Sequence, residues 1–402
     1  MSGVVVVGAG IAGVRAAEAL RGQGYSGPVT IIGAEQPVYR PAVSKDALRH
    51  PTQGDYGFPY RRSVDDLTWM IGSSVQSVDL TAKSLVVRST DGTTTPLAFD
   101  GIVIASGLSS RHLGIAGPKA GRHSLRTLAD AQALQPHLKP GIRLTVIGSG
   151  FVGCEVASTA RQLGCTVTMV APEDVPLASA VGDEVGQIIA RRLQEREVSL
   201  LARRTVLEYR GRVQVQEVVL DDDTSLATDI VVEAVGSTTN VAWLEDNGLD
   251  LSNGVLTDAY LRVVGAQAPA VACGDIARHP NAHFGPATRR IEHWTAAADM
   301  GSYAGRVLAG QLTGIEPDFP AFASIPAFWS DQFDFQIQSF GIPMLGEATN
   351  FVERDDDGSC IVEYLDDQGV VGVVGINRTA ELARYRKVLG TRRDALAGQP
   401  QV

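Results

Sequence analysis

Two stretches of the chain begin with a short run of β-branched residues, pass through a glycine-rich turn and continue with a helical pattern of apolar positions. The first stretch has Val4–Val7, then the turn, then Ile11–Gln23, and a second apolar run follows at Val29–Ile32. Continuous β-branched runs are typical of parallel strands that are buried on both faces. The pattern therefore predicts a strand–turn–helix–strand unit at the start of the chain.

The second stretch lies about 140 residues later and repeats this order. Leu144–Ile147 predicts a strand, Phe151–Leu163 a helix and Thr166–Val170 the next strand. Strands that alternate with helices indicate an α/β protein with parallel sheets. At 402 residues the chain is too long for one ordinary core, so two or three domains are expected.

The glycines of the first turn have the G-x-G-x-x-G spacing of a dinucleotide-binding loop. Gly8 permits the tight turn, Gly10 lets the backbone approach a pyrophosphate, and Gly13 allows the helix to pack against the strand. The N-terminus of the helix then offers unpaired N–H groups to the phosphates. Glu35 follows 22 positions after Gly13, where an acidic residue can bind the ribose hydroxyls of the adenosine.

The second turn has the same spacing, carried by Gly148, Gly150 and Gly153. Two such units in one chain predict two bound dinucleotides. Ala171 ends the second strand, at the position where an acid usually binds the ribose 2′-hydroxyl of NAD. Glu173 and Asp174 follow shortly, and we expect no Arg or Lys nearby to bind a 2′-phosphate. NADH is therefore favoured, and NADPH stays possible.

Composition narrows the class of protein. The net charge of -10 argues against a general nucleic-acid binder, because phosphate contacts need clustered Lys and Arg. No run of about 18 apolar residues occurs, so no membrane span is expected. The chain starts with a strand pattern where a signal peptide would have a basic segment and a cleavable spacer, which favours a cytoplasmic protein.

The spacing of the cysteines argues against thiol chemistry. The chain has four of them, Cys154, Cys165, Cys273 and Cys360, and no two form C-x-x-C or another close pair. Neither a zinc site nor a redox-active disulfide is indicated. Buried structural thiols are the expectation for all four, and no metal site is predicted.

Further signals follow predicted strands, where a flavin dinucleotide would need them. The strand Gly101–Ala105 ends in an Ala-Ser-Gly turn, and Gly236 lies just past the strand Ile230–Ala234. Gly274 and Asp275 come after another buried apolar run. Asp275 is thus a candidate for holding the ribitol hydroxyls, although a helix N-cap is an equally good interpretation of the pair taken alone.

Several strings spread along the chain resemble one family. They are YRPAVSK at Tyr39–Lys45, LRTLADA at Leu125–Ala131, GSGFVGCEVA at Gly148–Ala157, CGDI at Cys273–Ile276, RIEHW at Arg290–Trp294 and PAFWSDQFD at Pro326–Asp334. Over essentially its whole length the sequence resembles the bacterial FAD-dependent ferredoxin reductases of oxygenase and cytochrome P450 systems, the putidaredoxin reductase and biphenyl dioxygenase ferredoxin reductase family.

This resemblance implies an α/β fold with two Rossmann-like dinucleotide-binding domains, as in glutathione reductase, and a small C-terminal α+β domain. Residues 1–112 and 238–317 would form a discontinuous FAD-binding domain, 113–237 the NAD(P)H-binding domain and 318–402 the C-terminal domain. In the last of these, strands are expected at Phe335–Gly341, Cys360–Leu365 and Val370–Ile376. A helix over Thr379–Leu389, closed by Gly390, is expected to follow, and Asp355–Asp357 with Gly358 predicts a hairpin turn.

The resemblance also implies roles for single residues. The FAD contacts would be Gly8, Gly10, Ala12, Gly13, Glu35, Arg40, Lys45, Val75, Ala105, Arg126, Gly274, Asp275, Trp294 and Trp329. The NAD(P)H contacts would be Gly148, Gly150, Phe151, Val152, Gly153, Glu155, Ala171, Glu173 and Gly236. Lys45, beside flavin N5, would pair with Glu155, and these two are the predicted catalytic residues. Ala34 and Thr239 depart from the family pattern, which has Asp and Pro in their places.

The implied reaction passes a hydride from NAD(P)H to the flavin, and single electrons from the flavin to an iron–sulfur ferredoxin that serves a cytochrome P450 or another oxygenase. Ferredoxins are usually acidic, so basic side chains are docking candidates: Arg289, Arg290, Arg306, Arg384 and Lys387. The alternatives are a rubredoxin reductase, an NADH oxidase and a non-catalytic protein similar to apoptosis-inducing factor. A disulfide reductase would need a cysteine pair at the flavin.

Overall fold

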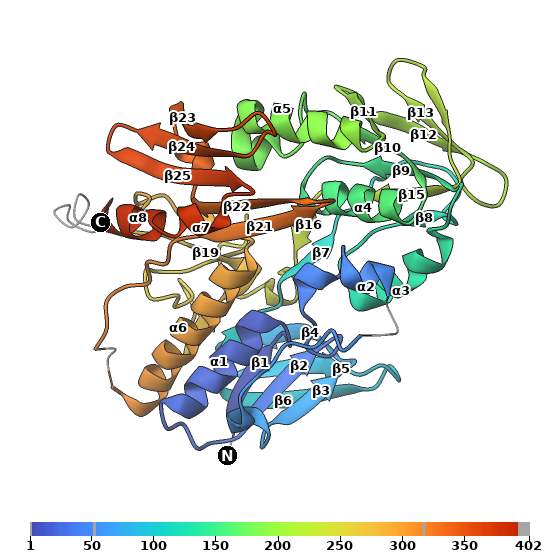
Figure 1. Cartoon of the computed structure of the whole chain (residues 1–402). Coiled ribbons are helices and arrows are strands. Elements are labelled where there is room, and N and C mark those ends of the chain that lie inside the picture. Colours follow the sequence, from blue (N-terminus) through green and yellow to red (C-terminus); the bar gives the residue numbers. More distant parts are fainter. Residues whose placement is uncertain (1, 51–53, 316–317, 393–402) are drawn as a thin grey trace.

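The first glycine-rich stretch lies in a sheet with strand order β3-β2-β1-β6-β5-β4, and β18 pairs with β6. The computed structural model describes residues 2–50, 54–315 and 318–392 (Figure 1). The strands are β1 (Gly3–Val7), β2 (Val29–Gly33), β3 (Thr68–Ile71), β4 (Ser74–Asp79), β5 (Ser84–Arg88), β6 (Thr94–Ile104) and β18 (Ala270–Ala272). The β1 partners, β2 and β6, are both parallel to it. Because β18 comes from far along the chain, two separate segments build this sheet, which we call the first unit.

Two helices of the first unit pack side by side on one face of its sheet (Figure 1). They are α1 (Ile11–Gly22) and α6 (Trp294–Thr313). Their backbones lie close together, since a Cβ on Gly301 of α6 would come within 2.2 Å of the Ala12 carbonyl oxygen. The two helices run in the same direction, since Gly305 likewise lies against Ala16, so their positive ends point the same way.

The second glycine-rich stretch lies in a parallel sheet with strand order β11-β10-β9-β15-β8, which we call the second unit. Its strands are β8 (Arg122–His123), β9 (Arg143–Ile147), β10 (Thr166–Ala171), β11 (Val198–Ala202) and β15 (Ile230–Glu233). Its helices are α3 (Leu128–Leu134), α4 (Phe151–Gln162) and α5 (Ala178–Glu195). A small antiparallel sheet of β12 (Val206–Arg210), β13 (Glu217–Leu220) and β14 (Ser225–Ala227) extends from one end.

Short elements connect these units. The chain crosses between the first and second units through an antiparallel pair, β7 (Leu108–Ser110) and β16 (Ser237–Thr239). A further small sheet has β17 (Val255–Leu256), β19 (Ala277–His279) and β20 (Arg289–Arg290). The short helix α2 (Asp46–Arg49) follows a 3-10 turn at Arg40–Ala42 and lies between the first and second units (Figure 1). No helix in the described part of the chain is long and apolar enough to cross a membrane.

The C-terminal unit is an antiparallel sheet with strand order β21-β22-β25-β24-β23. Its strands are β21 (Ala327–Gln332), β22 (Phe335–Gly341), β23 (Ala348–Arg354), β24 (Cys360–Asp366) and β25 (Gly369–Ile376). Buried side chains of this sheet and of the second unit form a single hydrophobic core, whereas the first unit has a core of its own. The sheet therefore packs on the second unit, and β21 reaches toward α4 (Figure 1).

The predicted α/β class, the two strand–turn–helix units and the C-terminal α+β unit are confirmed. The predicted turn at Asp355–Asp357 joins β23 to β24, and the Asp355 N–H donates to the Ser359 carbonyl at 2.9 Å. The prediction of one helix over Thr379–Leu389 is wrong. The structure has two short helices, α7 (Thr379–Leu382) and α8 (Tyr385–Thr391), with Ala383 and Arg384 between them; α7 buries Leu382, and α8 buries Tyr385 and Leu389, against the sheet. Gly390 lies inside α8 and lacks the positive φ of a terminating glycine.

Candidate active site

The first glycine-rich turn joins β1 to α1 and closes against the end of β6. Gly8 has a φ of +122°, and a Cβ on it would come within 2.0 Å of the Ala105 carbonyl oxygen. Only glycine fits there. By contrast, a Cβ on Gly10 would meet no atom of the described residues within 4 Å. Gly10 therefore faces open space at the N-terminus of α1, where backbone N–H groups can bind a pyrophosphate.

The second turn has the same geometry between β9 and α4. Gly148 has a φ of +100°, and its Cβ would lie 2.3 Å from the carbonyl oxygen that follows β15. A Cβ on Gly150 would again meet nothing within 4 Å among the described atoms. Phe151 packs edge-on against Phe328 of β21, with ring centroids 4.8 Å apart, and Val152 is exposed. The second turn thus has the same open space beside its middle glycine as the first.

Three other predicted glycines lie at close contacts that a side chain would block. A Cβ on Gly13 would lie 1.9 Å, and one on Gly153 2.2 Å, from the carbonyl oxygen of the first glycine in the same turn. These contacts hold α1 and α4 close to their own strands. A Cβ on Gly274 would lie 2.8 Å from the Ala12 Cβ. The segment that carries Asp275 is thereby held against the start of α1.

A line of charged groups connects the end of β2 with the segment after β18. Glu35 forms an ion pair with Arg40, and the Arg40 guanidinium also donates to the Arg126 carbonyl. Arg126 in turn forms an ion pair with Asp275 at 2.9 Å. Burial lowers the pKa of Arg40, although Glu35 opposes this change, and the guanidinium stays a cation at working pH. Four residues predicted to hold one dinucleotide therefore form one continuous polar network.

Polar atoms without partners border the same region. Among the described residues, Arg126 Nε and His293 Nδ1 are buried and have no hydrogen-bond partner. His293 is the N-cap residue of α6, and burial lowers its pKa from 6.5 to about 4, so the ring is neutral at working pH. Buried polar groups are normally hydrogen-bonded. These atoms, together with the open space at Gly10, fit a polar ligand such as FAD.

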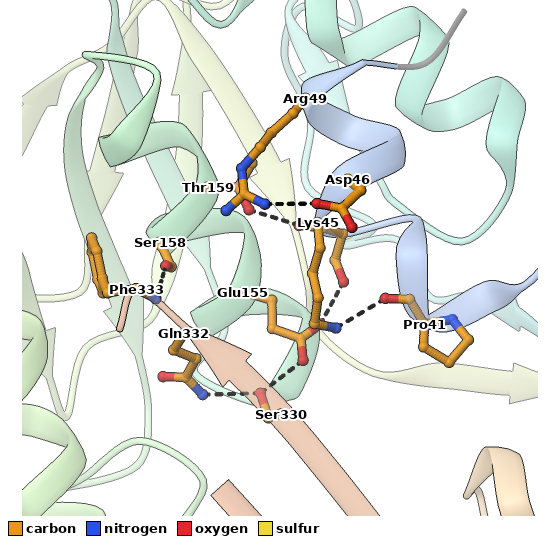
Figure 2. A network of polar contacts seen from close by, with 11 residues as sticks. Pro41, Lys45, Asp46, Arg49, Glu155, Ser158, Thr159, Ser330, Gln332 and Phe333 are labelled. Carbon is orange, nitrogen blue, oxygen red and sulfur yellow. Dashed lines mark hydrogen bonds and ion pairs between the residues drawn. The ribbon is translucent and has the colours of Figure 1, made fainter. Parts of the chain in front are cut away.

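Lys45 and Glu155 meet between the first and second units (Figure 2). The Lys45 Nζ lies 2.7 Å from Glu155 Oε2, and the side chains are only 14% and 7% exposed. Lys45 immediately precedes α2, and Glu155 comes from the first half of α4. Sequence separation is 110 residues, so the contact depends entirely on how the units pack. The catalytic roles of the two residues stay predictions.

The predicted aromatic contacts come from two units. Trp294, the first residue of α6, packs edge-on against Tyr39 and Phe58, with ring centroids 5.1 and 5.5 Å away. Trp329 is half-buried on β21 of the C-terminal sheet. Val75 is half-buried on β4, near the end of β2, since the Ser73 N–H donates to the β2 residue Gly33 at 3.1 Å. Their contacts with FAD stay predictions.

The far end of the second nucleotide site contains two arginines that the sequence argument missed. Ala171 is buried at the end of β10, and Glu173 lies 3.4 Å from the Ser149 hydroxyl. The residues after β11 come back to this loop: the Arg203 N–H donates to the Glu173 carbonyl and the Arg204 N–H to the Ala171 carbonyl. The expectation of no nearby Arg is therefore wrong. Parallel pairing of β10 with β11 brings the two strand ends together, and local sequence does not reveal it.

Other polar residues of the site were also missed. Ser44 and Ser330 both donate to the Glu155 carboxylate. In β21 the buried positions Phe328, Ser330 and Gln332 alternate with half-buried ones. A two-residue period in FWSDQ would have indicated a strand that turns two polar side chains inward.

The four cysteines are free thiols and buried. Burial raises the pKa of each, and that of Cys273 reaches about 12. A thiol of such high pKa is a poor nucleophile, because the thiolate is the reactive form. The arrangement supports electron transfer without a thiol intermediate.

Comparison with known proteins agrees with this geometry. Residues 2–301 match the family described as pyridine nucleotide-disulphide oxidoreductase, and residues 327–399 match the family described as reductase C-terminal. The anthranilate 1,2-dioxygenase system ferredoxin–NAD(+) reductase component of Burkholderia cepacia is 35% identical over 96% of this chain and 93% of its own length. Rhodocoxin reductase of Rhodococcus erythropolis is 30% identical over 96% of this chain and 89% of its own.

Solved structures give the same result. The covalent putidaredoxin reductase–putidaredoxin complex superimposes with a TM-score of 0.87 at 25% identity, over 97% of this chain and 93% of that chain. The ferredoxin reductase for the CYP199A2 system from Rhodopseudomonas palustris gives a TM-score of 0.86 at 27% identity, over 96% and 94%. The chain therefore belongs to the pyridine nucleotide-disulphide oxidoreductase family, among the bacterial FAD-dependent ferredoxin reductases of oxygenase and cytochrome P450 systems.

Proposed function

We propose that this chain is a ferredoxin–NAD(P)+ reductase that carries electrons from NADH through FAD to an iron–sulfur ferredoxin serving a cytochrome P450 or another oxygenase. The observation that carries the proposal is the buried Lys45–Glu155 contact, because it joins the two nucleotide-binding units at one point. The relatives indicate the acceptor, since they include reductase components of dioxygenase systems and putidaredoxin reductase in complex with putidaredoxin. A bound FAD supplies the conversion of a two-electron donor into one-electron steps.

In this proposal the network of Glu35, Arg40, Arg126 and Asp275 holds FAD along its length. Glu35 binds the adenosine ribose, Arg40 lies near the phosphates and Asp275 binds the ribitol. The guanidinium of Arg126 keeps the Asp275 carboxylate in place through their ion pair. The boundaries 1–112, 113–237, 238–317 and 318–402 are proposed for the domains, and the pairing of β18 with β6 supports a discontinuous FAD domain.

Within the described part of the chain, Lys45 and Glu155 each keep one hydrogen-bonding position open. Lys45 has three N–H donors and uses one on the Pro41 carbonyl at 2.9 Å and one on Glu155. Glu155 can accept about four hydrogen bonds, and its donors are Lys45, Ser44 and Ser330. One remaining donor and one remaining acceptor match the carbonyl and the amino group of a carboxamide. We infer that the pair holds the nicotinamide carboxamide at the flavin.

We propose NADH as the preferred donor. Glu173 supplies a carboxylate at the ribose end, and both nearby arginines are already paired: Arg203 with Asp174 at 3.1 Å, and Arg204 with Asp222 at 2.5 Å. Exposed ion pairs are weak, so a 2′-phosphate can still compete for these arginines. NADPH is thus expected as a slower donor. We propose the cytoplasm as the compartment, in agreement with the free thiols.

We propose a ferredoxin docking surface that includes Arg306, Arg384 and Lys387, which are exposed basic residues. Arg289 and Arg290 fit this role poorly. The Arg290 guanidinium donates to Asn253 at 2.8 Å and to the Asp275 carbonyl at 3.0 Å, and Arg289 donates to two backbone carbonyls.

Stopped-flow spectroscopy tests the proposal. The purified protein should show the absorption of oxidised flavin. This absorption should fall on mixing with NADH, and more slowly on mixing with NADPH. Mixing the reduced protein with an iron–sulfur ferredoxin under anaerobic conditions should restore the flavin spectrum as the ferredoxin is reduced. A protein that cannot be loaded with FAD, or whose flavin stays oxidised with both nucleotides, would contradict the proposal. The ratio of the NADH rate to the NADPH rate should fall in the Glu173→Gln variant and rise in the Arg203→Ala variant.

A further inference from the structure

The carboxylate of Glu155 is a junction of all three units (Figure 2). Lys45 and Ser44, which precede α2, both contact Oε2, and the Lys45 distance is 2.7 Å. Ser330 of the C-terminal strand β21 donates its hydroxyl to the other oxygen, Oε1, at 2.7 Å. The two carboxylate oxygens are thus held from opposite sides, which fixes the plane of the group.

A second residue determines the direction of the Ser330 hydrogen bond. The Gln332 amide nitrogen lies 3.2 Å from the Ser330 oxygen, and both side chains are completely buried. The amide nitrogen only donates, so the single hydroxyl hydrogen of Ser330 is left for Glu155. The opposite amide orientation would give Ser330 two acceptors and one hydrogen. Gln332, Ser330 and Glu155 therefore form a directed relay that ends on the carboxylate.

We propose that Ser330 and Gln332 are positioning residues for hydride transfer, because they orient Glu155 so that its open acceptor position meets the nicotinamide carboxamide. This inference rests on the proposed function, in which Glu155 binds that carboxamide. It gives the C-terminal unit a part in the nucleotide reaction, because both residues belong to its first strand.

The relay is not needed to hold the C-terminal unit in place. The Phe333 N–H donates to Ser158 of α4 at 2.6 Å, and the Tyr364 hydroxyl donates to the Val181 carbonyl of α5. A shared hydrophobic core adds to these contacts. Removal of one hydroxyl at Ser330 should therefore leave the packing of the units intact.

The first experiment is stopped-flow reduction of FAD-loaded Ser330→Ala by NADH. Loss of a hydrogen bond to a charged group should slow the limiting rate about tenfold, while FAD content stays that of wild type. Ser339→Ala is the matched control. Ser339 is completely buried in the neighbouring strand β22, and among the described residues its hydroxyl has no hydrogen-bond partner. An unchanged rate in Ser330→Ala, or an equal loss in Ser339→Ala, would overturn the inference.

The order of the relay is tested with Gln332→Met, which keeps the side-chain length and removes the amide donor. The single variant should slow reduction by a smaller factor than Ser330→Ala. The double variant should be no slower than Ser330→Ala alone, because Gln332 acts only through Ser330. Additive losses would show that Gln332 acts by another route and would overturn the relay.

A binding measurement tests the inference without turnover. Calorimetric titration of the FAD-loaded protein compares NAD+ with its analogue that carries a carboxylate in place of the carboxamide. Wild type should favour NAD+, since Glu155 repels the carboxylate, and Ser330→Ala should reduce this preference about tenfold. Equal preference in both proteins would overturn the inference and leave the proposed function standing. A wild type that binds both nucleotides equally would overturn the inferred contact between Glu155 and the carboxamide, and with it this inference, whereas failure of the proposed function would appear as a flavin that neither nucleotide reduces.

Discussion

Asp275 offers the most direct test of how the chain holds its flavin. Its carboxylate is 17% exposed and forms an ion pair with Arg126 at 2.9 Å, so it is oriented before FAD arrives. The proposed role is to accept hydrogen bonds from the ribitol hydroxyls. Asp275→Asn keeps the shape of the side chain and removes its charge, and Asp275→Ala also removes both acceptors.

The size of the effect follows from the hydrogen bonds that would be lost. A hydrogen bond to a charged group contributes about 1.5–3 kcal/mol, which corresponds to about a 10- to 150-fold change in a dissociation constant. Asp275→Asn keeps one amide acceptor, so it belongs at the lower end of this range. Asp275→Ala belongs at the upper end. Arg126 is 33% exposed and can turn toward solvent, so the loss of its partner should add little.

The assay is titration of FAD-depleted protein with FAD, followed by quenching of flavin fluorescence. The matched control is Asp250→Asn. Asp250 also forms an ion pair with an arginine, Arg278, but it is 44% exposed and lies outside the predicted FAD contacts. This control should bind FAD as wild type does. Asp275→Ala with an FAD affinity within twofold of wild type, or an equal loss in Asp250→Asn, would refute the ribitol role.

Two further predictions follow from the same region. A Cβ on Gly10 or Gly150 meets no described atom within 4 Å, so a valine at either position should not prevent folding. Gly10→Val should fold without retaining FAD, and Gly150→Val should retain FAD but lose its reduction by NADH. Circular dichroism and flavin absorbance separate these outcomes, and loss of the fold in either variant would contradict the reasoning. Burial lowers the pKa of His293 from 6.5 to about 4, so the unfolded chain binds more protons between these values. The unfolding free energy of FAD-free protein should therefore fall as the pH falls from 6.5 to 4, with about 3 kcal/mol of the loss due to His293. His293→Phe should show a shallower pH dependence in urea unfolding, and parallel profiles would count against this assignment.

Local sequence determined the nucleotide turns and little else about the site. The spacing of Gly8, Gly10 and Gly13 is a short-range property, because one strand end, one turn and one helix start lie within a few residues of each other. The same reasoning placed Glu35 and found the second unit. The two predicted strand–turn–helix units are confirmed, because neighbours in the sequence are also neighbours in space at such a turn.

Tertiary structure decided which residues from different units meet at the candidate site. Lys45, Glu155 and Ser330 come from three units, and the packing of β21 against α4 brings Ser330 to the carboxylate. Arg203 reaches the ribose end only because β11 pairs with β10. The order of the strands and the packing of the units depend on the burial of apolar faces that are distant in the sequence, so local sequence patterns do not predict them. The glycine spacing therefore predicts two bound nucleotides, the family resemblance predicts the pairing of Lys45 with Glu155, and only the folded chain adds Ser330 to that pair.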